Sequence, residues 1–176
     1  DLLAGQAEPV RPETRIGEER FIAEAAKAKD FLLRHKGWNE RGERMPVAFF
    51  DGTFLVSIAL PQTSLQRTFV ETMTDLMRVS EQARVPIVGY IDRSFSRDLL
   101  TMTNTAAERD AVPQLLYDAA VLRWLNMPWG SRSAFCFAKR KGLRDFVDAE
   151  SGLSLVGFTY LQTVSDSVPV RLDIPA

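Results

Sequence analysis

The sequence of 176 residues predicts a single α/β domain in which helices flank a mixed sheet. Short apolar runs, typical of buried strands, alternate with longer segments in which apolar residues recur at helical spacing. Two of the apolar runs end on an aspartate, Asp51 and Asp92. The closing residues contain two further strand-like runs joined by a polar turn at 165–167. We expect an N-terminal helical segment over residues 1–45 and a core over residues 46–176.

The elements are expected in a fixed order along the chain. Gly and Pro residues and the switch in apolar period mark their boundaries. The expected elements are a helix over 13–36, strands over 46–51 and 54–60 that form a hairpin at Asp51-Gly52, a helix over 65–84, a strand over 85–92, short helices over 96–102 and 113–125, and strands over 153–164 and 168–174. In the 113–125 helix, the spacing predicts that Leu115, Leu116, Ala119, Leu122 and Leu125 face inward.

The composition excludes several classes of protein. The formal net charge of −1 gives no overall attraction to nucleic acid, so a DNA-binding surface requires local clusters of Arg and Lys. No apolar run reaches the roughly 18 residues of a membrane span, and we expect no membrane association. The single cysteine, Cys136, excludes an internal disulfide and favours a reducing compartment, which we take as the cytoplasm. With His35 as the only histidine, a Cys/His zinc site is excluded and His-dependent hydrolysis is disfavoured.

Asp51 and Asp92 are the sharpest candidates for chemistry, because each ends an apolar strand at its carboxyl end. If the two strands are parallel neighbours, the carboxylates lie side by side at the edge where open α/β sheets place their sites. Their mutual repulsion would be relieved by a divalent cation such as Mg²⁺ or Mn²⁺, which prefers oxygen ligands. The alternative is structural: Asp51 begins an Asp-Gly turn, and Asp92 caps the next helix.

Other charged residues could complete such a site. The 65–84 helix offers Glu71, Asp75 and Glu81 as a third carboxylate, and helical periodicity does not choose among them. Arg93 and Arg97 could grip a DNA phosphate, or could form surface ion pairs with Asp98. The basic residues Lys139, Arg140 and Lys141 lie among Phe135, Phe137 and Phe146 and could follow a DNA backbone, although such aromatics more often belong to the core and such charges to a solvated loop.

Several short motifs follow one another along the chain: Phe50-Asp51-Gly52-Thr53, the run from Val85 to Ser94 with Tyr90-Ile91-Asp92-Arg93, Tyr117-Asp118-Ala119-Ala120, Gly130-Ser131-Arg132-Ser133, Phe158-Thr159-Tyr160-Leu161 and the run from Val168 to Pro175. Together these motifs resemble the NurA family of DNA-end-processing nucleases.

The resemblance implies a ribonuclease-H-like fold and an Mn²⁺-dependent (or Mg²⁺-dependent) deoxyribonuclease. It also implies a homodimer that resects DNA ends in double-strand break repair together with a HerA-type hexameric ATPase. By this likeness Asp51, Asp92 and Glu71 are catalytic metal ligands, with Asp75 as the substitute for Glu71. Arg93, Arg97, Arg132 and the basic residues 139–141 would contact DNA, and Tyr160 would lie near the site.

Family members are usually longer and carry a late histidine, so we expect the core to be incomplete at its C-terminus. Two other readings therefore stay open. One is a catalytically impaired scaffold that docks on the ATPase. The other is an α/β domain that binds a small molecule at the same strand ends.

Overall fold

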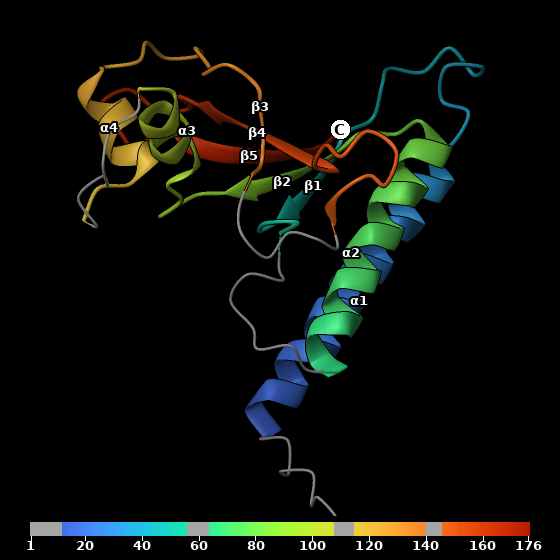
Figure 1. The fold of residues 1–176 in the computed structure, drawn as a ribbon. Helices are drawn as coiled ribbons and strands as arrows, with labels where there is room; N and C mark the ends of the chain where they lie inside the picture. Colours follow the sequence, from blue (N-terminus) through green and yellow to red (C-terminus); the bar gives the residue numbers. More distant parts are fainter. Residues whose placement is uncertain (1–11, 56–63, 108–114, 140–145) are drawn as a thin grey trace, which may run out of the picture.

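The computed structural model describes residues 12–55, 64–107, 115–139 and 146–176. In these residues a five-stranded mixed sheet is accompanied by four helices, which confirms the α/β class and is consistent with a ribonuclease-H-like fold (Figure 1). The elements are α1 Pro12–Arg34, β1 Ala48–Asp51, α2 Ser64–Ala83, β2 Ile87–Ile91, α3 Asp98–Ala106, α4 Asp118–Trp124, β3 Cys136–Phe137, β4 Val156–Leu161 and β5 Val170–Pro175.

The strand order in the sheet is β1-β2-β5-β4-β3. β1 and β2 are parallel, and α2 lies between them in the chain, as a parallel connection requires. β5 pairs antiparallel with both β2 and β4, and β3 pairs antiparallel with β4. The expected 153–164 and 168–174 strands are therefore a hairpin, and Asp166 in its turn adopts the left-handed conformation (φ 59°).

The register shows which side chains share a face of the sheet. Phe50 pairs with Gly89, Gly89 with Asp173, and Asp173 with Phe158, so one row crosses four strands on the same face. The next row on that face contains Ile91, Arg171 and Tyr160. The row between them, on the opposite face, runs from Asp51 through Tyr90 and Leu172 to Thr159.

Side chains from all four described helices contact the Phe50 face of the sheet. The centre of the Phe21 ring on α1 lies 6.1 Å from the centre of the Phe50 ring and 4.5 Å from that of Phe69 on α2. The helices α1 and α2 therefore pack over β1 together. Lys29 of α1 is paired with Asp75 of α2, 2.6 Å apart, and the Trp38 indole donates to the Arg84 carbonyl oxygen. Farther along the same face, Asp98 and Asp118 of α3 and α4 bind Arg171 and Tyr160.

Two expected elements differ from the structure. The 113–125 helix begins only at Asp118, because Tyr117 is extended (φ −132°, ψ 156°) and the Asp118 carboxylate accepts the backbone N–H groups of Leu99 and Leu100 at the start of α3. The inward orientation expected for Leu115 and Leu125 is consequently wrong, since they are 91% and 70% exposed. The expected 54–60 strand lies mostly outside the described residues, and its first two residues, Phe54 and Leu55, are buried without strand pairing.

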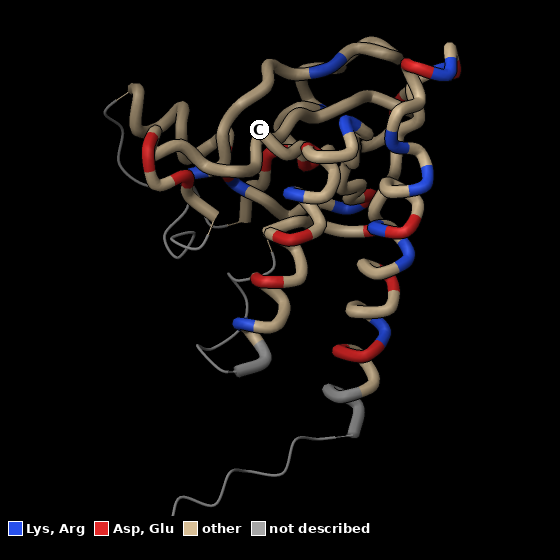
Figure 2. The backbone as a smooth tube through the Cα atoms, turned by 90° about the vertical axis from the view of Figure 1, so that its right-hand side faces the viewer, with Lys and Arg blue, Asp and Glu red and all other residues tan. Residues whose placement is uncertain are grey.

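Figure 2 shows Lys and Arg interspersed with Asp and Glu along the long helices, so neither helix carries a stripe of one sign. Within the described part of the chain, no helix is long and apolar enough to cross a membrane.

Candidate functional site

The parallel pairing of β1 with β2 brings Asp51 and Asp92 to the same edge of the sheet. Asp51 is the last residue of β1 and is in register with Tyr90, and Asp92 follows directly after Ile91, the last residue of β2. This confirms that the two strands are adjacent and parallel. We call this pair of strand ends, with Asp51 and Asp92, the carboxylate edge.

Both carboxylates of this edge are available for a ligand. Asp51 and Asp92 are exposed, and neither makes a hydrogen bond or ion pair with the described part of the chain. The structural alternative for Asp92 is wrong, because α3 starts six residues later and the residue at its cap position is Arg97. Asp51 does precede a turn: Gly52 has a φ of 133°, where a side chain would be strained.

A close backbone approach shapes the end of β1. The Gly52 N–H donates to the Tyr90 carbonyl oxygen at 3.0 Å, which extends the β1–β2 pairing by one residue. A Cβ on Gly89 would lie 2.6 Å from the Gly52 carbonyl oxygen, so only glycine fits at that position of β2 without movement of the turn. Gly89 therefore sets how closely the turn after Asp51 approaches β2.

The helix carboxylates occupy different positions relative to this edge. The Phe21 ring packs against both Phe50 of β1 and Phe69 of α2. Glu71, two residues after Phe69, is exposed in this part of α2. Glu81 is near the start of β2 and lines a hollow with Val85 and Pro86, at the opposite end of the strand from Asp92. No three His, Cys, Asp or Glu side chains lie close enough to hold a metal ion together within the described ranges.

The Asp75 carboxylate is already paired with two basic side chains. Its carboxylate accepts hydrogen bonds from Lys29 and Arg78. These hydrogen bonds, first from Lys29 and then from Arg78, lower the pKa of Asp75 below its ordinary value. Asp75 therefore fastens α2 to α1 in this structure.

The basic residues are also divided between the two ends of the sheet. Arg93 is exposed directly beside Asp92. Arg132 is exposed, and its backbone forms an isolated antiparallel β-bridge with Leu161 at the end of β4. The end of β4 lies at the same edge as the end of β2, because Tyr160, Arg171 and Ile91 share a row of the sheet. Arg97 is half-buried.

Lys139 is exposed just beyond β3, next to the start of β4, at the opposite end of the sheet from the carboxylate edge. Arg140 and Lys141 lie outside the described residues. A groove of about 560 Å³ beside Asp51 adds two exposed cations from α1, Arg20 and Lys27, together with Phe49.

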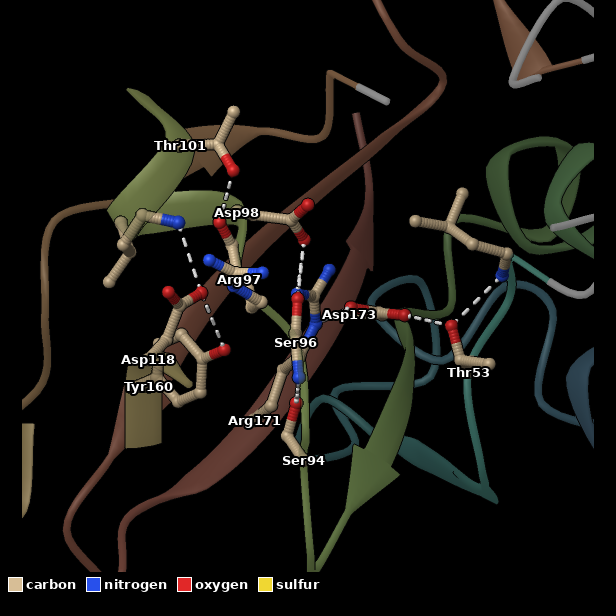
Figure 3. Close-up of polar contacts among 12 residues, drawn as sticks. Thr53, Ser94, Ser96, Arg97, Asp98, Thr101, Asp118, Tyr160, Arg171 and Asp173 are labelled. Carbon is tan, nitrogen blue, oxygen red and sulfur yellow. Dashed lines mark hydrogen bonds and ion pairs between the residues drawn. The ribbon is translucent and has the colours of Figure 1, made fainter. Parts of the chain in front are cut away.

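Beneath this edge lies a group of buried polar side chains that sequence reasoning missed. Arg171 on β5 is 2% exposed and Asp173 is fully buried. The Arg171 Nε donates to Asp173 at 2.7 Å, and its Nη1 donates to the Ser96 hydroxyl at 2.6 Å and to Asp98. Burial opposes the charge on Arg171, but Asp173 and Asp98 outweigh it and raise its pKa. We call Arg171, Asp173, Asp98, Ser96 and Thr53 the Arg171 network (Figure 3).

Tyr160 lies beside this network and is fully buried. Its hydroxyl donates to Asp118 at 3.0 Å. Burial and the nearby Asp118 charge raise the pKa of Tyr160 to about 12, and burial also raises the pKa of Asp118. Tyr160 is two strands away from β2, and besides Asp118 its hydroxyl interacts with Arg171 and with Ser94, which lies two residues after Asp92.

The chain is similar to a known protein family. The NurA domain family matches residues 6–176, which is nearly the whole chain. Searches of curated proteins and of solved structures find no match.

Proposed function

This chain belongs to the NurA family of nucleases that process DNA, and we propose that it is a deoxyribonuclease whose metal ion is held at the carboxylate edge. The observation that carries the proposal is the parallel register of β1 and β2, which ends both strands in an exposed carboxylate at one edge. The family match supports DNA as the substrate.

The side chains at this edge fit a divalent cation of the Mn²⁺ or Mg²⁺ type. Such ions prefer carboxylate oxygens, and Mg²⁺ is commonly bound by one or two carboxylates, with water and substrate phosphate completing its shell. Asp51 and Asp92 supply two such groups, and no cation of the described chain competes for them. When bound, the ion would activate water and neutralise charge on the scissile phosphate.

The chain's own residues would bind and orient the DNA. Arg93, exposed next to Asp92, would hold a phosphate beside the ion, because a guanidinium matches phosphate oxygens in pairs. Arg132 would contact the same strand farther along this edge. Lys139 is at the other end of the sheet, so we propose it only as a contact for DNA that extends beyond the site.

We propose Glu71 as the third carboxylate. The Phe50–Phe21–Phe69 contacts bring this part of α2 toward the end of β1, whereas Glu81 lies at the far end of β2 and Asp75 is paired with Lys29 and Arg78. Glu71→Gln should therefore lower nuclease activity more than Glu81→Gln does. Greater loss from the Glu81 substitution would contradict this choice.

We also propose, from family membership, that the protein resects DNA ends during double-strand break repair as a homodimer beside a HerA-type hexameric ATPase. On α1, Leu32 is buried within the chain, while Ile16 and Ile22 are 67% and 39% exposed and could join a dimer contact. Light scattering at micromolar concentration should give the mass of two chains, and a monomeric mass would contradict the dimer.

The decisive test of nuclease function is a DNase assay on end-labelled linear DNA with Mn²⁺. Removing a partner that only orients a metal ligand commonly costs 10–100-fold, so removing a ligand in Asp51→Asn should lower the rate by at least about 100-fold. Asp166→Asn changes an exposed aspartate in the β4–β5 turn and should retain wild-type activity. Equal cleavage rates for wild type and Asp51→Asn would contradict a metal site at Asp51, and the absence of Mn²⁺-dependent cleavage by wild type would favour a scaffold that docks on the ATPase.

A further inference from the structure

Arg171 and Asp173 lie between the two segments that follow the proposed metal ligands. Both project from β5 on the helix-covered face, and β5 pairs directly with β2. The Arg171 guanidinium also lies 4.2 Å from the centre of the Phe158 ring, which fixes it from one side. The position of this side chain is thus determined by a strand, a ring and several polar partners at once.

The first connection from this pair is a hydrogen bond to the segment after Asp51. The Thr53 hydroxyl donates to the Asp173 carboxylate at 2.5 Å and accepts the Leu55 N–H at 3.0 Å. Thr53 is two residues from Asp51, with only Gly52 between them. The turn at the end of β1 is therefore fastened to β5 across the intervening strand β2.

The second connection from this pair is a set of hydrogen bonds to the segment after Asp92. The Arg171 Nη1 donates to the Ser96 hydroxyl and to Asp98, and the Ser96 hydroxyl lies 2.8 Å from Asp98. The Ser96 N–H in turn donates to the Ser94 hydroxyl at 3.3 Å, which links the residues closest to Asp92. Ser94 is 7% exposed and Asp98 is 5% exposed, so these contacts are shielded from solvent.

We infer that Arg171 and Asp173 are positioning residues that hold Asp51 and Asp92 at the spacing a divalent ion requires. One buried arginine–aspartate pair joins both loops, and the proposed ligands themselves have no other side-chain partner in the described chain. A functional site needs its ligands held within about 0.5 Å, and side chains that do not bind the ion commonly supply that order. The inference rests on the proposed metal site.

The test uses Thr53, because its hydroxyl can be removed without touching the Arg171–Asp98 pair. We would measure Mn²⁺ affinity without DNA, from the electron paramagnetic resonance signal of free Mn²⁺. Thr53→Val should weaken Mn²⁺ binding about 10-fold, at the lower end of the effect of partners that orient metal ligands. Thr53→Ser keeps the hydroxyl and should bind within about twofold of wild type, since the hydrogen bond to Asp173 is kept.

A matched control separates positioning from general stability. Thr103→Val removes an exposed threonine hydroxyl that bonds to the α3 carbonyl oxygens of Leu99 and Leu100, and should leave Mn²⁺ affinity unchanged. If Thr53→Val does not fold, Ser96→Ala removes the hydroxyl that contacts both Arg171 and Asp98 on the Asp92 side. The direct Arg171–Asp98 contact remains in this variant, so Mn²⁺ binding should weaken by less than about 10-fold but measurably.

The outcomes distinguish this inference from the proposed function. Wild type that binds Mn²⁺ through Asp51, together with Thr53→Val of equal affinity and a lower melting temperature, would overturn the positioning role alone. Wild type that binds Mn²⁺ no better than Asp51→Asn would overturn the metal site and the positioning role together.

Discussion

The carboxylate edge and the Arg171 network contain the same kinds of side chain in opposite circumstances. Asp51 and Asp92 are exposed and have no partner in the described chain, whereas Asp173 and Asp98 are buried and bound to Arg171. A carboxylate that already has a cation contributes to the fold, and one without a cation can bind a ligand. The difference explains why we expect substitutions in the network to lower stability as well as metal affinity, and substitutions at the edge to lower metal affinity with little change in stability.

The largest stability effect should come from Arg171→Met. It leaves Asp98 and Asp173 buried without their cation, and breaking a buried pair commonly costs about 3–5 kcal/mol. Urea unfolding should show this loss of unfolding free energy. The triple variant Arg171→Met, Asp98→Asn, Asp173→Asn should recover most of it, because no unpaired charge remains. A loss of unfolding free energy below about 1 kcal/mol for Arg171→Met would contradict the expectation that the Arg171 network contributes more to stability than the carboxylate edge does.

A smaller effect is expected from Gly89→Ala, which tests how the edge is built. The new Cβ would meet the Gly52 carbonyl oxygen at 2.6 Å and force the turn after Asp51 to move, at a cost of about 1–3 kcal/mol. Gly17→Ala, in α1 with open space around it, should instead be neutral or stabilising. If Gly89→Ala unfolds at the same urea concentration as wild type, the close approach of Gly52 is not a constraint.

The smallest expected effect at neutral pH on the free energy of unfolding comes from the raised pKa of Tyr160. Its pKa in the folded state is raised from 10.0 to about 12, chiefly by burial and then by Asp118. The neutral form is therefore favoured by folding: this contribution to stability is complete below pH 10 and is lost as the pH rises through about 12. Alkaline titration by ultraviolet absorbance should show one late tyrosine ionisation, and Tyr160→Phe should remove it. A late step that persists in Tyr160→Phe would assign it to another residue.

Local patterns in the sequence predicted the carboxylate edge well. Two apolar runs that end in aspartate, separated by a segment of helical period, predict parallel strands joined by a helix, and β1, α2 and β2 confirm that order. Gly89 within the second run was a further local signal, since glycine in a strand often marks a close backbone approach.

The Arg171 network could not be predicted in the same way. In Val170-Arg171-Leu172-Asp173-Ile174 the alternation suggests that the polar residues face solvent, yet Arg171 and Asp173 are the buried ones and Leu172 is half-exposed. Their burial depends on partners 73 and 120 residues away along the chain, Asp98 and Thr53. Charge pairing at that separation leaves no local period, so only the assembled sheet reveals it.

The central claim is that Asp51 and Asp92 together bind a divalent metal ion, and an Mn²⁺ titration of Asp92→Asn tests it most directly. The account predicts that wild type binds Mn²⁺ and that Asp92→Asn binds at least about 10-fold more weakly, with a melting temperature within a few degrees of wild type, because surface substitutions rarely change stability much. Equal Mn²⁺ affinity in the two proteins would contradict the claim.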